Sequence, residues 1–302
     1  MAGWRRVAGS THLRVFEVAA ITAAGAIAPR GDSIKDAAPP SVSSEAQKGK
    51  VSVVWKRIFG RPDESRRPRP RVAPGTRIYA IGDIHGRADL LEQMLLKVDA
   101  DMKDHPDRRC ITVLLGDYVD RGPDSRGVID LLIAWQKVRE TVCLMGNHEE
   151  IMLRFFAKPE LWDTWAPIGG AQTVMSYGLR PALRLSPQQA AELADRLAEQ
   201  IPDAHVDFLG SLPYTFESGD VLFVHAGLKP GRPVADQRVE DLLWIREEFL
   251  SFKGSFGKLV VHGHTPVDKP DIQPNRINID TGAYATGRLC CLVLQDGGIT
   301  FL

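Results

Sequence analysis

Five short polar segments, each directly following an apolar, β-prone run, constrain this chain more than any other feature. The segments are residues 82–86, 116–122, 146–149, 224–227 and 263–266, and the runs before them are residues 78–81, 111–115, 142–145, 221–224 and 259–261. An open α/β sheet builds its site at the carboxyl ends of its strands. We therefore expect the five segments to converge on one edge of a sheet.

The segments carry hard metal ligands. These are Asp83, His85, Asp117, Asn147, His225 and His264. The set contains no cysteine, which argues against a site for a soft metal. Asp83 and His85 are expected to hold one divalent metal, Asp117 to bridge to a second, and the other three to complete the second. An asparagine ligand is neutral, so the site keeps a positive charge that suits a phosphate ester.

Two divalent metals about 3.5–4 Å apart share a water and lower its pKa, and the resulting bridging hydroxide attacks phosphorus directly. Arg121, and Arg246 on a helix expected at residues 239–249, are candidates to grip phosphate, because guanidinium matches phosphate bidentately. His148 is the candidate acid that protonates the leaving oxygen. Asp120 is the candidate carboxylate that keeps His148 charged and oriented.

Strands alternate with helices from Thr76 onward. Strands are expected at residues 77–82, 110–115 and 141–145, followed by helices at 88–103, 125–138 and 149–157. This alternation predicts a largely parallel sheet with right-handed crossovers. A helical insert at about 158–212, with its clearest helix at 187–200 capped by Ser186, precedes a strand-rich second half. Its strands are expected at residues 214–217, 221–224, 259–261, 276–279, 289–294 and 297–302.

Residues 1–75 differ in composition from the rest. Ser, Pro, Ala and Gly dominate residues 31–50, and a basic, Pro-rich tract covers 61–71. We expect a disordered or weakly structured extension and linker, with docking to an anionic partner as the alternative. No run reaches the roughly 20 apolar residues of a membrane span. The nearest, at residues 15–28, is interrupted by Glu17 and leaves a signal peptide open.

The formal net charge is zero, so no overall field points to a stable nucleic-acid or membrane partner. The four cysteines, Cys110, Cys143, Cys290 and Cys291, are expected to be buried thiols of a cytoplasmic protein. Cys290 and Cys291 should point to opposite faces of a strand. Three histidines outside the motifs are expected at the surface, namely His12, His105 and His205.

From about Thr76 to Leu302 the chain resembles the calcineurin-like metallophosphoesterases, and within them the bacterial phosphoprotein phosphatases of Ser/Thr type. The resemblance rests on GDxHG at residues 82–86, GDxxDRG at 116–122, GNHE at 146–149 and the later histidines. It implies that residues 76–302 form an α/β fold, a four-layer α/β/β/α sandwich of two mixed β-sheets flanked by helices. It also implies a dinuclear site, most often manganese in bacterial members, with iron or zinc as alternatives.

Carried over by position, the resemblance implies the same roles as the chemistry above. The first metal takes Asp83, His85 and Asp117; the second takes Asp117, Asn147, His225 and His264; His148 and Asp120 form the acid pair; Arg121 and Arg246 hold phosphate; and Tyr284 matches a family tyrosine near the substrate. His264 rather than His262 fits the family's Gly-His-Thr pattern. More distant metallophosphoesterases use two histidines spaced two residues apart, so His262 is the alternative ligand.

The first functional hypothesis is a Ser/Thr phosphoprotein phosphatase, a phosphomonoester hydrolase acting on a phosphoprotein or a phosphorylated small molecule. The alternative is a symmetrical bis(5′-nucleosyl)-tetraphosphatase or a related nucleotide pyrophosphohydrolase. Asp120 favours the phosphoprotein phosphatase, because the related tetraphosphatases usually lack this aspartate. Trp162 and Trp165 could stack a base or fill a helical core, and core filling is preferred. The oligomeric state stays open.

Overall fold

The structure is a computed structural model, and it describes residues 5–6, 16–17 and 70–302. Three segments discussed above lie outside the described residues. They are the expected linker at 31–50, the apolar run at 15–28 except residues 16–17, and the basic tract up to residue 69. Near the N-terminus, strands β1 (Arg5–Arg6) and β2 (Phe16–Glu17) pair antiparallel. All other elements of the described residues lie between residues 70 and 302.

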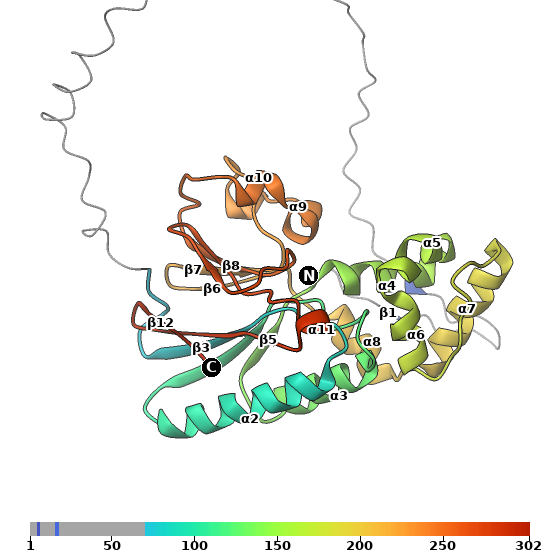
Figure 1. Ribbon diagram of the computed structural model, residues 1–302, viewed down its shortest axis with the longest axis horizontal. Coiled ribbons are helices and arrows are strands. Elements are labelled where there is room, and N and C mark those ends of the chain that lie inside the picture. The colour runs from blue at the N-terminus through green and yellow to red at the C-terminus, as the bar shows by residue number, and fades with distance from the viewer. Residues whose placement is uncertain (1–4, 7–15, 18–69) are drawn as a thin grey trace, which may run out of the picture. The chain divides into compact units, whose positions relative to one another are not determined.

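Two mixed β-sheets form the centre of the fold (Figure 1). The first has the order β12-β11-β3-β4-β5, and the second has the order β6-β7-β8-β10-β9. The strands of the first are β3 (Thr76–Ile81), β4 (Arg109–Leu114), β5 (Thr141–Cys143), β11 (Cys291–Gln295) and β12 (Gly298–Phe301). Those of the second are β6 (Thr215–Ser218), β7 (Val221–Val224), β8 (Leu259–His262), β9 (Asp271–Ile272) and β10 (Arg276–Asn278).

The prediction of a largely parallel sheet is right for three adjacent strands of each sheet, which lie at the β5 edge of the first sheet and in the middle of the second. Strands β3, β4 and β5 run parallel, as do β7, β8 and β10, whereas β6, β9, β11 and β12 pair antiparallel with their neighbours. Short connections account for the pairs β6–β7, β9–β10 and β11–β12, because two strands joined by a tight turn must be antiparallel. Strand β11 also pairs antiparallel with β3, which is distant in the sequence. Asp296 and Gly297, which join β11 to β12, both have positive φ, at 50° and 81°, as a two-residue hairpin turn requires.

Helices cover the outer face of each sheet and complete four layers, so the expected α/β/β/α fold is confirmed (Figure 1). Helices α2 (Ala88–Asp104) and α3 (Ser125–Gln136) lie against the first sheet. Helices α9 (Val239–Trp244) and α10 (Glu247–Leu250) lie against the second. The expected single helix at 239–249 is thus two helices, broken at Ile245 and Arg246. In a continuous helix Arg246 would lie four residues after Leu242 and three before Phe249, on the buried face.

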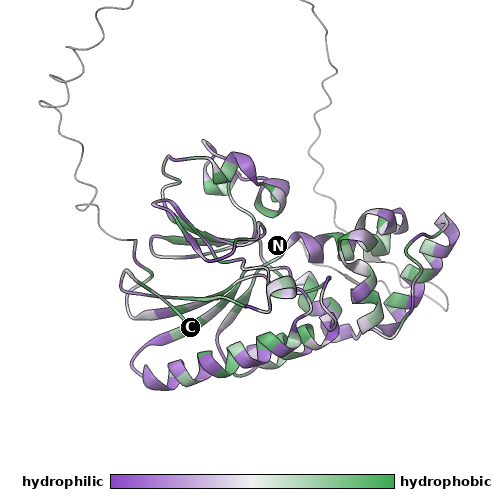
Figure 2. Cartoon of the chain, viewed as in Figure 1, coloured by the Kyte–Doolittle hydropathy of each residue, from purple (hydrophilic) through white to green (hydrophobic). Residues whose placement is uncertain are grey.

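Alternating side chains of the strands fill three separate apolar layers. Val221 and Phe223 of β7 pack between the two sheets, whereas Leu222 and Val224 pack toward α9 and α10. Both faces of the strand are buried, which is why it reads as a continuous apolar run (Figure 2). Cys290 and Cys291 enter opposite layers, as expected, and all four cysteines are free.

The region between β5 and β6 is helical, as expected. Its elements are α4 (Asn147–Ala157), η2 (Pro159–Leu161), α5 (Trp162–Trp165), η3 (Ala166–Ile168), α6 (Gly170–Ser176), α7 (Pro187–Gln200) and α8 (Asp203–Gly210). Ser186 caps α7, because its hydroxyl accepts from Gln189 N while the Gln189 side chain accepts from Ser186 N. Later in the chain follow η4 (Val234–Asp236) and α11 (Ala283–Thr286).

The surface prediction for His205 is wrong. Its side chain is 2% exposed, and its two ring nitrogens lie 2.9 Å from the Tyr177 hydroxyl and 2.8 Å from Asp130 Oδ1. Two polar partners satisfy the ring, so burial costs little. His105 is partly exposed, and His12 lies outside the described residues.

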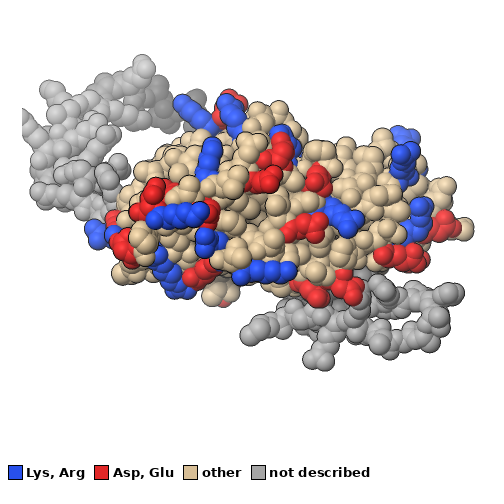
Figure 3. All heavy atoms as spheres, turned by 90° about the horizontal axis from the view of Figure 1, so that it is seen from below, with Lys and Arg blue, Asp and Glu red and all other residues tan. Residues whose placement is uncertain are grey.

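Charges of both signs are interspersed on the face shown in Figure 3, in keeping with the zero net charge. No helix of residues 70–302 is long and apolar enough to cross a membrane.

Candidate active site

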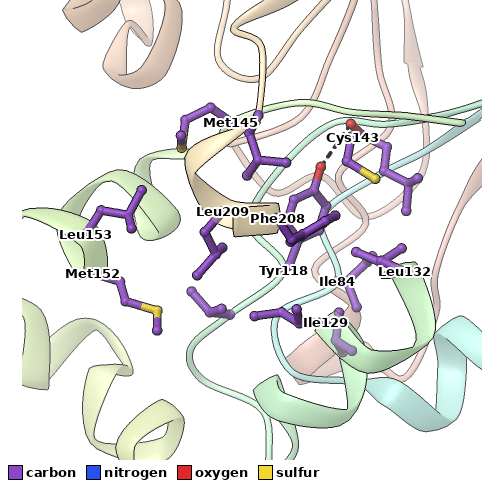
Figure 4. Close-up of a cluster of buried hydrophobic side chains, with 14 of the residues drawn as sticks. Ile84, Tyr118, Ile129, Leu132, Cys143, Met145, Met152, Leu153, Phe208 and Leu209 are labelled. Carbon is purple, nitrogen blue, oxygen red and sulfur yellow. Dashed lines mark hydrogen bonds between the residues drawn. The ribbon is translucent and has the colours of Figure 1, made fainter. Parts of the chain in front are cut away.

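Each candidate ligand lies at or just past the end of a strand, so the two sheets bring them together. Asp83 and His85 follow β3, Asp117 follows β4, Asn147 opens α4 after β5, and His225 and His264 follow β7 and β8. The apolar residues between them point the other way. Ile84 and Tyr118 are fully buried in the core (Figure 4). Tyr118 Oη donates to Leu144 O at 2.7 Å. This anchoring leaves the neighbouring polar side chains facing the site.

The backbone of the site is unusual. Five of its non-glycine residues have φ between +49° and +73°: His85, Asp117, Asp120, Arg121 and His264. Such conformations cost on the order of 1–3 kcal/mol each and persist only where the surroundings enforce them. Glu149 supplies one restraint, because its buried carboxylate accepts hydrogen bonds from four backbone N–H groups. The donors are Asp117, Tyr118, Val119 and Gly146, at 2.7–3.1 Å.

The Asp117 carboxylate lies at the centre of two groups of possible metal donors. Its Oδ2 lies 3.4 Å from His85 Nε2 and 3.8 Å from His148 Nε2. Its Oδ1 lies 3.3 Å from His225 Nε2, which is also 2.9 Å from Asn147 Oδ1. Within residues 70–302, two triads have one donor atom per residue within 4.8 Å of one another: His85, Asp117 and His148, and Asp117, His225 and His264.

Two buried donor atoms of this cluster lack a hydrogen-bond partner among the described residues. Asp83 Oδ1 and His264 Nε2 are buried without any hydrogen bond, although Asp83 Oδ2 accepts from His264 N at 2.9 Å. The Nδ1 atoms of His85 and His225 each lie 2.9 Å from a backbone carbonyl, of Val119 and Leu115. A carbonyl only accepts, so Nδ1 carries the proton and Nε2 keeps its lone pair for a metal.

The charge states also fit a cation. Burial lowers the pKa of His85 to about 3 and that of His264 to about 2, so both rings are neutral at pH 7. Burial, followed by the nearby Asp280 and Asp117 carboxylates, raises the pKa of Asp83 well above its ordinary value. Neutral imidazoles beside crowded carboxylates form a donor set for divalent metals. The residues present therefore fit a pair of cations.

His148 and Asp120 form a buried pair, with Nδ1 of the ring 2.6 Å from Oδ2 of the carboxylate. Burial lowers the pKa of His148, but Asp117 and the hydrogen bond with Asp120 outweigh it, so the pKa is raised. Arg121 Nη2 lies 3.5 Å from His148 Nε2. The Arg121 guanidinium also stacks 4.6 Å from the ring centre of Tyr284, which is 38% exposed and contacts His85 edge-on.

Arg246 lies at the break between α9 and α10 and contacts the loop that carries His264. Its Nη1 donates to His264 O and to Thr265 Oγ1, both at 3.2 Å. Trp244, 39% exposed, lies edge-on to His264 with ring centres 6.2 Å apart. His262 does not join the cluster, because its ring packs edge-on against Phe249 at 4.8 Å.

The sequence motifs alone predict no role for Glu149 or Asp280. Glu149 belongs to the 146–149 motif, but only the structure shows its four backbone partners. Asp280 follows β10 as the ligands follow other strands, and its Oδ1 accepts from Gly282 N at 2.9 Å. Its place after a strand end was the available signal.

Comparison with known proteins agrees with this geometry. Residues 76–299 match the calcineurin-like phosphoesterase family over most of the chain. The chain belongs to the calcineurin-like phosphoesterases.

Curated relatives of this phosphoesterase include two proteins named bis(5′-nucleosyl)-tetraphosphatase PrpE [asymmetrical]. The protein from Anoxybacillus flavithermus is 28% identical over 70% of this chain and 88% of its own length. The protein from Bacillus thuringiensis is 30% identical over the same shares. A crystal structure of a protein assigned as a diadenosine tetraphosphatase superimposes with a TM-score of 0.53, at 24% identity, over 77% of this chain and 97% of that one.

The expected family is therefore confirmed, and the chain is a phosphoesterase with metal-donor groups of the expected kinds. Both relatives are named as nucleoside tetraphosphatases and not as Ser/Thr protein phosphatases. Their names read asymmetrical, whereas the nucleotide alternative predicted from the sequence was symmetrical.

Proposed function

We propose that this phosphoesterase hydrolyses dinucleoside polyphosphates, cutting a dinucleoside tetraphosphate asymmetrically into a nucleoside triphosphate and a nucleoside monophosphate. The observation that carries the proposal is the shared name of relatives that match 88% of their own length. The site offers a structural reason. Two half-exposed aromatic side chains, Tyr284 and Trp244, border the metal donors near His85 and His264, and aromatic faces stack on nucleobases.

We propose that the donors divide as predicted from the sequence. Asp83, His85 and Asp117 would hold one divalent cation, and Asp117, Asn147, His225 and His264 would hold the other. When bound, the two cations supply Lewis acidity toward phosphoryl oxygen and lower the pKa of a water to near neutrality. Manganese is the proposed metal, with iron or zinc as alternatives.

The chain's own residues then orient the substrate and move a proton. Arg121 and Arg246 offer guanidinium groups on two sides of the cluster to bind phosphate oxygens. Tyr284 supports the Arg121 guanidinium by stacking against it at 4.6 Å. His148, with its Nδ1 engaged by Asp120, has Nε2 available to donate a proton to the leaving oxygen.

A Ser/Thr protein phosphatase is the second candidate, and the acid pair favours it. A phosphate leaving group departs readily without a proton, whereas the alkoxide of serine needs one. A buried carboxylate that holds a histidine at 2.6 Å is more useful against a serine phosphate than against an anhydride.

Comparing kcat/KM for diadenosine tetraphosphate and a phosphoserine peptide separates the two candidates. The manganese-loaded enzyme should favour the dinucleotide by about a hundredfold or more and release ATP and AMP in equal amounts. Release of ADP alone would make the cleavage symmetrical, and preference for the phosphopeptide would establish the second candidate. Asp117→Asn is the control, because activity of this site must be lost with that carboxylate.

A further inference from the structure

The helical region between β5 and β6 contacts the proposed acid pair directly. We propose that Thr173 of α6 and Trp165 of α5 are positioning residues that hold Asp120, and through it His148, for proton transfer to the leaving group. The inference rests on the acid role of His148 proposed above, and it concerns residues that no motif includes.

The Asp120 carboxylate is fully buried and accepts three hydrogen bonds from different parts of the chain. His148 Nδ1 and Trp165 Nε1 share Oδ2, at 2.6 and 2.8 Å. Thr173 Oγ1 donates to Oδ1 at 2.6 Å. Both oxygens are thus engaged, so rotation of the carboxylate would break bonds at both ends.

Thr173 is itself held in place. Its hydroxyl donates to the Asp120 carboxylate, accepts from Asp120 N at 2.8 Å, and lies 2.9 Å from Ser125 Oγ. Ser125 Oγ also accepts from Asp120 N at 3.0 Å. One buried hydroxyl therefore contacts the side chain and the backbone of Asp120. A buried carboxylate depends on such donors, because it has no water to replace them.

The same region restrains the backbone next to the acid pair. Asp120 and Arg121 have φ of 73° and 67°, conformations that need enforcement. Arg121 N donates to Gly169 O at 3.3 Å. Gly169 has φ +121°, and a side chain there would collide with Arg121 N. The segment from Trp165 to Thr173 thus holds both Asp120 and the proposed phosphate-binding Arg121.

Substitutions can remove the hydrogen bonds while keeping most of the packing. Thr173→Val deletes the hydroxyl, Thr173→Ser restores it, and Trp165→Phe deletes the indole N–H. Trp162→Phe is a matched control, because Trp162 is equally buried in the same aromatic cluster but its indole N–H donates to Ala182 O at 3.1 Å, away from Asp120.

The test measures kcat and KM of the manganese-loaded enzyme on phenyl phosphate, a poor leaving group, and on 2,4-dinitrophenyl phosphate, a good one. A general acid contributes about 10²–10⁴-fold where the leaving group needs a proton. We expect Thr173→Val to lower kcat on phenyl phosphate about tenfold or more, and on the dinitrophenyl ester less than about twofold. Trp165→Phe should show the same selectivity, Thr173→Ser should restore kcat, and Trp162→Phe should show no selectivity.

Equal losses on both esters, or no loss from either Thr173→Val or Trp165→Phe, would overturn the inference. His148→Asn serves as the reference for the acid role. If His148→Asn is selective for the poor leaving group while both positioning variants are not, the inference fails and the proposed acid survives. If His148→Asn shows no selectivity, both fail. Should Thr173→Val not fold, Trp165→Phe against Trp162→Phe still decides.

Discussion

Replacing Asp280 with asparagine should stabilise the metal-free protein at neutral pH and weaken the holoenzyme. Asp280 is 2% exposed, and burial raises its pKa from 3.8 to about 6. Between these two values the folded chain keeps a proton that the unfolded chain has released, so stability falls as pH rises through this window. At about 1.4 kcal/mol per pH unit, the difference between the two pKa values corresponds to about 3 kcal/mol of folding free energy. This stability is lost completely above the folded-state pKa.

Asp280→Asn keeps a carbonyl oxygen to accept from Gly282 N but cannot ionise. In urea denaturation with a chelator, the variant should exceed the unsubstituted protein in free energy of unfolding by about 3 kcal/mol at pH 7.5 and match it near pH 4. With manganese restored the order should reverse, because cations neutralise the crowded carboxylates. Asp107→Asn, at a side chain that is 73% exposed, removes the same charge without burial and is the control. An Asp280→Asn gain equal at both pH values, or a loss at pH 7.5 without metal, would refute the reasoning.

Three further predictions concern groups around the site. Gly263→Ala places a methyl group against Asp83 Oδ1, so bound metal and activity should both fall, and metal analysis of the dialysed protein checks this. Glu149→Gln puts an amide N–H₂ among four backbone donors and should lower the free energy of unfolding by about 2–4 kcal/mol in urea, with a smaller loss contradicting the role of Glu149. His205→Phe removes the histidine partner of the Tyr177 hydroxyl and should lower the free energy of unfolding by about 1–3 kcal/mol. The kcat for 2,4-dinitrophenyl phosphate should stay unchanged, because His205 lies outside the metal-donor cluster.

The ends of strands and the candidate metal donors could be located in the sequence because each signal is local. An apolar run followed by Gly-Asp or Gly-His is readable within a few residues. Strand β7 and helix α7 have the expected bounds, Val221–Val224 and Pro187–Gln200. The five segments follow strands of two different sheets. Which strands share a sheet depends on pairing between residues far apart in the sequence, and local periodicity does not predict such pairing.

Side-chain partners distant in sequence were beyond local reasoning. Trp165 and Thr173 lie 45 and 53 residues after Asp120, and core packing was a sufficient account of a buried tryptophan. Trp165 does fill the core, as expected, but its indole N–H also donates to Asp120 of the proposed acid pair. At Arg246 the local pattern was misleading. Periodicity predicted one helix through this position, but a continuous helix would have placed the arginine on its buried face, so a break between α9 and α10 is more favourable.

The central claim, that distant donors form one site for two cations, is tested most directly by titrating chelator-treated protein with Mn²⁺ in a calorimeter while phosphoesterase activity is followed. The claim predicts two bound cations per chain, activity that returns with them, loss of both from Asp117→Asn, and loss of one from His264→Ala. A single bound cation at full activity, or hydrolysis that survives complete chelation, would contradict it.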